Sequence, residues 1–410
     1  MGSRILIYGS TYITECVVEE LKRHFNLVGY VPSENPVFPG KIDLKLTTSD
    51  EPHDIKLSIQ YDKKIEDHHN AYNLHTGLLP EYGGCNILHH TLKNGAKEQG
   101  LTFHKMTGKF DEGEIISKMT YPVLETDTVA DLYERMATVA PLFAVNTLKL
   151  LPIKGEAKKP TIYKRESNQA EVDTINARIN SACKVIAVAY CPSRAIRGEA
   201  KFPDHNQVVS SSGDHLTMWQ FLADREIEVD AGMPVDTIII VNGTDLGFWD
   251  KYNGVRTRNG VIKVLYRPNI GGSFGAYDFA FQNTKYRYYL FTEDDLPVLG
   301  DGYYTKLLSK LGMGVGFVGL IGVSAGFHPQ HCHGAVGLTS RAILERVCSN
   351  NKGSLPYSKL GWDRQNVIQE GEIPFTNEIV RLGYQLIPYG KPEWSKDNLV
   401  YPYFNYVQKI

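Results

Sequence analysis

Short apolar runs, each followed by a turn and then a helical pattern, constrain the fold of this 410-residue chain most strongly. Residues 4–8 form one such run, and residues 13–24 then place apolar side chains on one face of a helix. Strands buried in a parallel sheet are continuously apolar, because helices cover both faces. We therefore predict an α/β protein with parallel sheets. In the second half of the chain the runs occupy residues 184–190, 237–241, 262–266 and 287–291.

Length and composition divide the chain into two predicted domains. Residues 1–152 form the first domain, which ends in a long helical pattern that Thr126 or Asp127 would cap. Residues 153–180 are polar and interrupted by proline, so they are predicted to be a linker. Residues 181–410 form the second domain.

Three polar residues in the first domain are suited to acyl transfer onto an amine. Asn73 and His75 are one residue apart in an extended segment, so their side chains point to the same side. A neutral imidazole accepts the proton of an attacking amine near pH 7, and an amide N–H stabilises the oxyanion that forms. Asp111 supplies a carboxylate that can set the tautomer of the imidazole and stabilise its charged form.

An alternative interpretation makes Asn73 the cap of a turn and His75 a buried structural residue. The Leu-Leu-Pro sequence at residues 78–80, the Gly-Gly turn at residues 83–84 and the later Asp-x-Gly motif favour catalysis instead.

These motifs resemble the folate-dependent formyltransferases, over residues 1–150. The segments are N-L-H-T-G-L-L-P-E-Y-G-G at residues 73–84 and H-K-M-T-G-K-F-D-E-G-E-I-I at residues 104–116. The family includes methionyl-tRNA, glycinamide ribonucleotide and nucleotide-sugar formyltransferases. The resemblance implies a Rossmann-like domain, 10-formyltetrahydrofolate as donor, and catalysis by the three residues above. Members often carry serine where this chain has Gly77, a position interpreted as shaping the turn.

Within this family, residues 29–33, 39–41 and 58–63 most resemble bacterial sugar N-formyltransferases. Those enzymes act on dTDP-linked 3- or 4-amino-dideoxy sugars made for surface polysaccharide such as the O-antigen of lipopolysaccharide. Gly9 and Ser10 could cradle a phosphate, and a purely structural turn is the alternative interpretation of these two residues. The resemblance implies cofactor contacts at Ile59, Gln60, Tyr61 and Gly113, and substrate contacts at Tyr82, Gly83, Gly84, Gly9 and Ser10.

Composition argues against several other partners. A formal net charge of −2 gives no bulk attraction for nucleic acid, so no nucleic-acid partner is expected. Six cysteines without a C-x-x-C pair indicate neither a zinc site nor a disulfide framework, and reduced thiols fit a cytoplasmic location. No apolar run reaches the length of a membrane span, and no signal-peptide pattern precedes the first predicted strand.

Polar residues follow three predicted strands of the second domain, at the strand ends where parallel α/β sheets bind ligands. The glycine-rich turn at residues 269–275 opens a helix, where free N–H groups favour anions. Carboxylates at residues 293–295 could hold Mg²⁺ or Mn²⁺ against a diphosphate, and residues 242–245 could bind a base or ribose. The candidate residues are Asn242, Asp245, Asn269, Gly271, Gly272, Glu293, Asp294 and Asp295.

In their order along the chain, these motifs resemble the GT-A fold glycosyltransferases of the family-2 type, over residues 181–395. The resemblance points to Glu372 as a catalytic base, although the second acid expected near it is missing. A working transferase and a non-catalytic nucleotide-sugar-binding or scaffold domain therefore both stay open. The histidine-rich residues 328–333 are interpreted as a loop at the acceptor mouth rather than a metal site.

Three functions follow from these patterns. The first is N-formylation of a dTDP-linked amino sugar by the first domain. The second adds transfer of a sugar by the second domain, and the third leaves that domain non-catalytic. Formylation of methionyl-tRNA is disfavoured by the net charge and by the lack of the small barrel that those members carry. The position of the sugar amine and the nucleotide stay open, and a homodimer is compatible with the resemblance.

Overall fold

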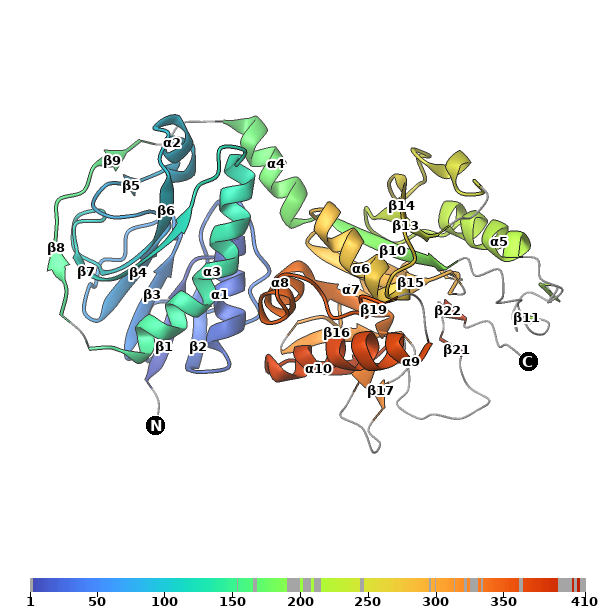
Figure 1. Ribbon diagram of the computed structural model, residues 1–410. Helices are drawn as coiled ribbons and strands as arrows, with labels where there is room; N and C mark the ends of the chain where they lie inside the picture. The colour runs from blue at the N-terminus through green and yellow to red at the C-terminus, as the bar shows by residue number, and fades with distance from the viewer. Residues whose placement is uncertain are drawn as a thin grey trace. The chain divides into compact units, whose positions relative to one another are not determined.

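The chain forms two compact units, Met1–Ile179 and Asn180–Ile410, each with its own β-sheet (Figure 1). The computed structural model describes three stretches, with gaps in the first. They are residues 3–389 except 153, 165–167, 190–199, 202–207, 210–214, 244–246, 295, 299, 313, 321–322, 325–330, 333–334 and 361–363, and residues 400–401 and 404–405. Within these residues, no helix is both long and apolar enough to cross a lipid bilayer.

The sheet of the first unit is Rossmann-like on one side and antiparallel on the other. Its strand order is β2-β1-β3-β4-β6-β7-β8, with parallel pairing up to β4 and antiparallel pairing from β4 onward. β4 therefore lies where the sheet changes direction. The strands are β1 (Arg4–Tyr8), β2 (Asn26–Val31), β3 (Ile55–Ile59), β4 (Ala71–His75), β6 (Glu98–Lys105), β7 (Glu114–Pro122) and β8 (Glu156–Ala157).

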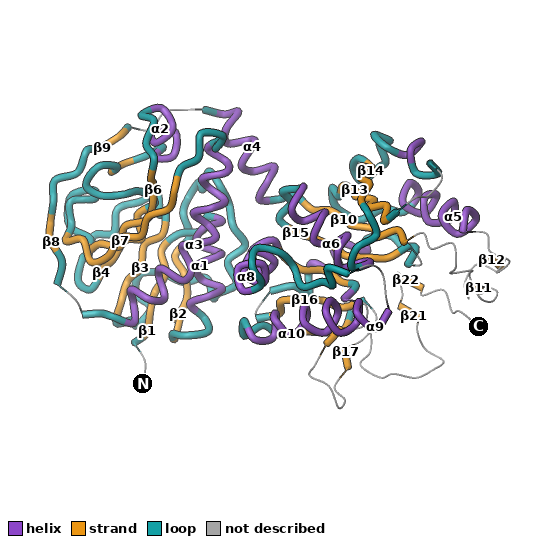
Figure 2. Tube along the Cα trace, in the orientation of Figure 1, coloured by secondary structure: helices purple, strands orange, loops and turns teal. Residues whose placement is uncertain are grey.

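The helices of the first unit pack on this sheet through apolar faces. α1 and α3 lie side by side, and α1 buries Val17 and Leu21 against the apolar residues of β1 (Figures 1 and 2). A short parallel pair of strands, β5 and β9, lies outside the main sheet. These elements are α1 (Tyr12–Leu21), α2 (Ile87–Lys93), α3 (Val129–Lys149), α4 (Gln169–Ile179), β5 (Gly83–Gly84) and β9 (Ile162–Tyr163).

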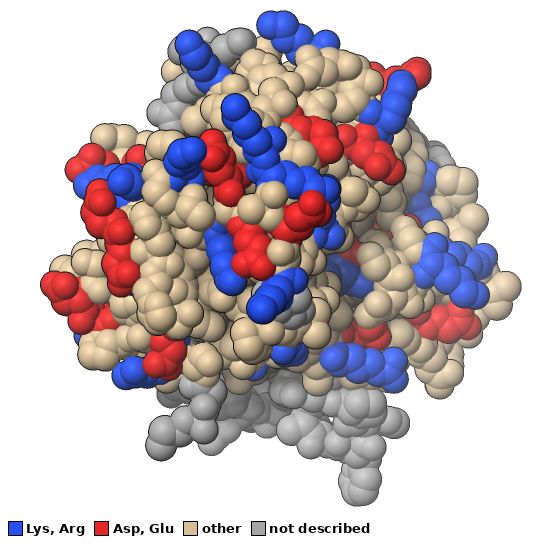
Figure 3. Space-filling view, turned by 90° about the vertical axis from the view of Figure 1, so that its left-hand side faces the viewer, with Lys and Arg blue, Asp and Glu red and all other residues tan. Residues whose placement is uncertain are grey.

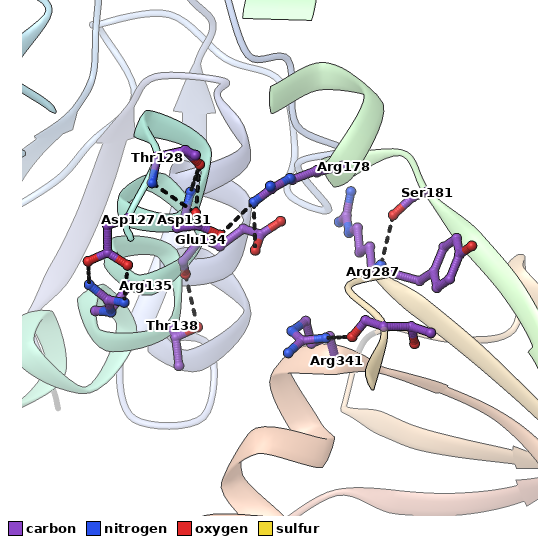
Figure 4. A network of polar contacts seen from close by, with 12 residues as sticks. Asp127, Thr128, Asp131, Glu134, Arg135, Thr138, Arg178, Ser181, Arg287 and Arg341 are labelled. Carbon is purple, nitrogen blue, oxygen red and sulfur yellow. Dashed lines mark hydrogen bonds and ion pairs between the residues drawn. The ribbon is translucent and has the colours of Figure 1, made fainter. Parts of the chain in front are cut away.

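The start of α3 differs from the prediction. Thr128 is the cap, and it forms a capping box with Asp131. Asp127 cannot serve as the cap, because its carboxylate accepts the Leu124 N–H and pairs with Arg135 at 2.6 Å. Figure 4 shows both interactions of this turn, the capping box and the Asp127–Arg135 pair.

Much of the stretch expected to be a linker, residues 153–180, belongs to the first unit instead. Ile175 and Ile179 of α4 are buried in the core of that unit. Arg178 extends from α4 to Asp131 of α3 at 2.9 Å (Figure 4). This packing is not evident from the polar composition, because two apolar residues one turn apart are enough to pack a short helix against the core.

The sheet of the second unit is mixed, whereas a parallel sheet was expected. Its order is β14-β13-β10-β15-β19-β16-β20, and β19 runs antiparallel to both of its neighbours. β19 has only four residues and no long apolar run, so no strand was predicted there. The strands are β10 (Ala182–Ala189), β13 (Asp236–Asn242), β14 (Ile262–Arg267), β15 (Tyr288–Glu293), β16 (Val315–Gly319), β19 (Gly337–Ser340) and β20 (Gln385–Pro388).

The four apolar runs predicted in this half correspond to β10, β13, β14 and β15. The helices of the unit are α5 (His215–Glu228), α6 (Gly272–Asn283), α7 (Tyr303–Leu308), α8 (Arg341–Asn350), α9 (Arg364–Val367) and α10 (Ile373–Arg381), with η1 (Asp250–Tyr252) and the π-helical turn η3 (Ile368–Glu372). Short two-stranded pairs join β11 (Ala200–Lys201) to β12 (Val208–Val209), β17 (Val323–Ser324) to β18 (His331–Cys332), and β21 (Val400–Tyr401) to β22 (Phe404–Asn405).

One ion pair is fully buried in the core of the second unit. Lys184 of β10 contacts Glu226 of α5, and Thr237 donates its hydroxyl hydrogen to the same carboxylate at 3.1 Å. Burial lowers the pKa of Lys184, while the neighbouring carboxylate acts in the opposite direction. The pair joins α5 to the sheet from inside the protein.

Candidate active site

β4 and β6 place the amide and two imidazoles of this site next to one another. Asn73 and His75 alternate with Leu74 on β4, so they share one face of the strand. The antiparallel register then sets His104 of β6 directly beside Asn73. Their side chains meet, with Nδ2 of Asn73 3.2 Å from Nε2 of His104.

A backbone carbonyl fixes the tautomer of His75. Its Nε2 lies 2.7 Å from the carbonyl oxygen of Tyr82, which can only accept, so Nε2 carries the proton of the neutral ring. Nδ1 is then left with a lone pair. The side chain is 6% exposed, and burial lowers the pKa of His75 although Asp111 and the Tyr82 carbonyl raise it. Near neutral pH the ring is therefore a neutral base.

Asp111 faces both histidines. Its Oδ1 lies 3.5 Å from Nδ1 of His75 and 3.5 Å from Nε2 of His104, while Oδ2 accepts the Gly84 N–H at 2.8 Å. Burial alone would raise the pKa of Asp111, but His104, His75 and the Gly84 N–H together hold it below its ordinary value. The carboxylate is therefore ionised. The backbone φ of Asp111 is 56°, a left-handed conformation that costs free energy in residues other than glycine.

His104 is a site residue that the sequence analysis did not single out. Its Nδ1 donates to the Lys105 carbonyl at 2.8 Å, and its Nε2 lies between Nδ2 of Asn73 at 3.2 Å and Oδ1 of Asp111 at 3.5 Å. The residue is 2% exposed. The motif around Asp111 begins with His104, but its place next to Asn73 depends on the pairing of two strands distant in sequence.

One role predicted for Asp111, setting the tautomer of His75, belongs instead to a backbone carbonyl. Asp111 was predicted to set the tautomer of His75, but the Tyr82 carbonyl holds that proton and Asp111 faces the other ring nitrogen. Gly77 makes room for this carbonyl. A Cβ added at Gly77 would lie 2.6 Å from the Tyr82 oxygen and 3.0 Å from Nε2 of His75. The prediction that Gly77 shapes the turn thus has a specific steric cause.

A cavity of about 710 Å³ opens beside this cluster, within the first unit. Its lining combines the catalytic candidates with apolar side chains of three other segments, including Phe38, Leu88 and Met136. The cations Lys63, Lys64, Lys109 and Lys164 also contribute to the lining.

The sequence-predicted binding residues divide into two groups. Gln60, Tyr61 and Gly84 line the cavity together with Asn73, His75 and Asp111. The others have structural roles and do not belong to the lining. Ile59 is fully buried, Gly113 packs on the Lys105 carbonyl, Tyr82 and Gly83 form the turn behind His75, Gly9 bonds to the Val31 carbonyl, and Ser10 accepts the Ser33 N–H.

In the second unit, the strand ends bring some of the predicted residues together. Oδ1 of Asn242, at the end of β13, accepts from Arg267 at 2.6 Å, and Nδ2 donates to the Gly272 carbonyl at 3.4 Å. Oε1 of Glu293 accepts from Ser273 at 2.5 Å. Oδ2 of Asp294 accepts the Trp219 indole N–H at 3.0 Å.

The remaining second-unit candidates are less connected to that group. Gly271 adopts a left-handed φ of 71° before α6, and the buried Oδ1 of Asn269 has no hydrogen-bond partner among the described residues. Glu372 is 8% exposed at the end of η3. Asp245, Asp295 and most of residues 328–333 lie outside the described residues.

No group of three or more His, Cys, Asp or Glu side chains is arranged to hold a metal ion in the part of the chain that the structure describes. Asp295, one of the three predicted carboxylates, is not in that part. The expectation of Mg²⁺ or Mn²⁺ in the second unit stays a prediction.

Comparison with known sequences shows that the segment containing this site matches a protein family. The formyl transferase family model matches residues 65–148, which include Asn73, His75, His104 and Asp111. Methionyl-tRNA formyltransferase of Natranaerobius thermophilus is 34% identical over 99 residues, which are 24% of this chain and 30% of that protein. Methionyl-tRNA formyltransferase of Streptococcus pyogenes is 36% identical over 88 residues, 22% of this chain and 28% of that protein. The chain therefore spans less than a third of the length of these curated relatives.

Two solved structures are also similar. The N-formyltransferase from Helicobacter canadensis, in complex with folinic acid and dTDP-3-aminofucose, is 20% identical over 39% of this chain and 70% of that chain, with a TM-score of 0.35. A sugar 3N-formyl transferase solved with dTDP and 5-N-formyl-THF is 22% identical over 40% of this chain and 70% of that chain, also with a TM-score of 0.35. At these scores neither likeness carries an argument. The family match and the curated relatives support a formyltransferase enzyme.

Proposed function

We propose that the first unit transfers the formyl group of 10-formyltetrahydrofolate to the amine of an amino sugar carried by dTDP. One observation carries the proposal. Asn73, His75 and Asp111 line a single cavity, inside the segment that matches the formyl transferase family. The cavity volume of about 710 Å³ lies within the usual range for small-molecule sites, and its mixed apolar and polar lining suits a folate ring.

His75 is the proposed base. The folate would supply the activated formyl carbon, which the amine attacks. Nδ1 of His75 accepts the amine proton as the new C–N bond forms, because Nε2 is already bonded to the Tyr82 carbonyl. Asp111, ionised and 3.5 Å from Nδ1, stabilises the resulting imidazolium. The proton then passes to the departing nitrogen as the old C–N bond breaks.

Asn73 is the proposed oxyanion donor. Its amide has two N–H groups, of which one is directed to Nε2 of His104. The second can be donated to the formyl oxygen as negative charge develops there. His104 fixes the plane of the amide and so acts as a positioning residue. One such donor is worth about 10²–10³ in rate.

An amino sugar is the preferred acceptor. Residues 29–33, 39–41 and 58–63 resemble the sugar N-formyltransferases, and the net charge of −2 offers no general attraction for RNA. On the face shown in Figure 3, basic side chains are interspersed with acidic ones rather than gathered into a patch. Methionyl-tRNA is the second candidate, because the curated relatives carry that name.

A substrate panel tests the choice. The full chain is incubated with 10-formyltetrahydrofolate and either a dTDP-3-amino sugar, a dTDP-4-amino sugar or methionyl-tRNA, and products are identified by mass. Formylation of a dTDP-amino sugar at a kcat/KM well above that for methionyl-tRNA is expected. Efficient formylation of methionyl-tRNA, with no product from the sugars, would overturn the sugar assignment while leaving formyl transfer intact.

For the second unit we propose a GT-A type domain that binds a nucleotide-sugar, in an enzyme of O-antigen or related surface polysaccharide synthesis in the cytoplasm. Support comes from the ends of β13 and β14, which meet the start of α6 through Asn242, Arg267 and Gly272. Sugar transfer with Glu372 as base, and a non-catalytic scaffold, are the alternatives. Metal-dependent release of nucleotide by the full chain, reduced in Asn242→Ala, would favour the transferase.

A further inference from the structure

The turn that follows β4 supplies the backbone partners of two proposed catalytic side chains. The Tyr82 carbonyl accepts the Nε2 proton of His75 at 2.7 Å, and the Gly84 N–H is donated to Asp111 at 2.8 Å. Both groups belong to residues 80–85, here called the catalytic turn. The position of this turn therefore determines the tautomer of His75 and the orientation of the carboxylate.

A segment from far along the chain holds the catalytic turn on its other side. Residues 160–163, here called the return segment, come after the long helix α3. The Thr161 N–H is donated to the Pro80 carbonyl at 2.7 Å, and the Thr161 carbonyl accepts the Gly83 N–H at 2.8 Å. The Tyr163 carbonyl accepts the Cys85 N–H at 3.0 Å. Three backbone hydrogen bonds thus join the two segments along the length of the turn.

Tyr163 also anchors the return segment through its ring. The ring is stacked with that of Tyr82 at 5.6 Å between centroids and with that of His90 at 4.3 Å. Its hydroxyl oxygen accepts a hydrogen bond from Asn94 at 3.0 Å. The ring contacts connect α2, the return segment and the residue whose carbonyl holds His75.

The fit between the two segments leaves no room for a side chain at Gly84 and little at Gly83. A Cβ at Gly84 would lie 2.2 Å from the Tyr163 carbonyl oxygen, and a Cβ at Gly83 would lie 2.9 Å from Ile162. The two glycines therefore allow the return segment to approach closely. This gives Gly83 and Gly84, which were predicted to bind substrate, a different reason to be glycine.

We infer that Tyr163 is a positioning residue for formyl transfer, which acts by holding the catalytic turn so that the Tyr82 carbonyl and the Gly84 N–H keep His75 and Asp111 in place. The inference rests on the proposed function of the first unit. A displacement of about 1 Å at a catalytic group can cost about 10²-fold in rate. Tyr163 also lines the cavity, so the expected signature of losing its ring is a lower kcat together with a change in the His75 tautomer.

The test compares Tyr163→Ala with Tyr163→Phe in the full chain. Tyr163→Ala is expected to lower kcat by about tenfold to a hundredfold. Tyr163→Phe keeps the ring and loses only the hydroxyl, so it should retain most of the wild-type kcat. Asn94→Ala removes the same hydrogen bond from the other partner and should behave like Tyr163→Phe.

A second measurement does not depend on turnover. Nitrogen-15 NMR of the His75 ring should show one tautomer, with Nε2 protonated, in the wild type and in Tyr163→Phe. A mixture of tautomers is expected in Tyr163→Ala. A wild type that formylates no amine would defeat the proposed function without touching this NMR result. An active wild type whose Tyr163→Ala variant keeps full kcat and a single tautomer would overturn the positioning role, and so would a folded Tyr163→Phe as impaired as Tyr163→Ala.

Discussion

The two units both contain clusters of polar residues that the sequence singled out, but they use them differently. In the first unit, Asn73, His75 and Asp111 line one cavity, and each keeps a donor or acceptor available for chemistry. In the second unit, the Asn242 amide bonds to Arg267 and to a backbone carbonyl, and Asp294 bonds to a core tryptophan. A polar motif thus forms a reactive site where partners hold its polar atoms in place and leave at least one donor or acceptor available.

The largest expected effect separates these two clusters directly. His75→Ala removes the base and should lower formyl transfer by about 10²–10⁴, and Asn73→Ala should lower it by about 10²–10³. Asn242→Ala in the second unit should leave formyl transfer unchanged. Steady-state kinetics on all three variants, with thermal unfolding to confirm the fold, checks the comparison. Rates near wild type in both first-unit variants would contradict the catalytic roles of His75 and Asn73.

In the second unit, by contrast with the reactive groups of the first, a buried charged pair contributes to stability. Lys184 is fully buried against Glu226, so Lys184→Ala leaves a carboxylate without its cation and should destabilise the unit by about 3–5 kcal/mol. Lys263→Ala is the matched control, since that lysine is half exposed and its pair with Asp236 is worth less than about 1 kcal/mol. Chemical denaturation measures both. Equal losses in the two variants would contradict the structural role of the buried pair.

Gly77 tests how tightly the first-unit site is built. In Gly77→Val the branched side chain would push the Tyr82 carbonyl away from His75, and a loss of kcat of about 10²-fold is expected. Gly95→Asn offers a control in the same unit, because no atom lies within 4 Å of its added Cβ and asparagine tolerates the left-handed φ of 62°. A fully active Gly77→Val would mean that the turn can move without loss of activity.

The smallest expected effect is a shift in pH dependence. Burial lowers the pKa of His75 from its ordinary value of 6.5, so the acid limb of kcat/KM should fall below that pH. Asp111 raises the pKa of His75, and Asp111→Asn should therefore move the limb to still lower pH, because the base stays neutral further into acid. A limb that moves to higher pH in Asp111→Asn would contradict the assignment of His75 as the base.

The fold was predictable where side chains alone determine it. The apolar runs of β10, β13, β14 and β15 are short, and several are rich in β-branched or aromatic residues, which together favour buried strands. α4 was missed as part of the first unit because Ile175 and Ile179 are its only fully buried apolar contacts. β19 was missed because four residues, of which only Leu338 is a large apolar one, carry no pattern.

The site residues were likewise predictable only where their own side chains identify them. Asn73, His75 and Asp111 were identified because their side chains carry chemistry and their motif has recognisable spacing. His104 was not, because its position depends on the register between β4 and β6. The Tyr82 carbonyl and the return segment left no signal at all, since backbone groups are the same in every residue.

The hydrogen bond from His75 to the Tyr82 carbonyl has a consequence for how this protein can evolve. No codon change can delete a main-chain oxygen, so a substitution at position 82 keeps the acceptor as long as the peptide stays in place. Variation that damages the reaction must instead move the peptide, through Gly77 or through the residues that press on the turn. Among descendants of this chain, we expect the spacing of these neighbours to persist longer than the identity of the tyrosine they hold in place.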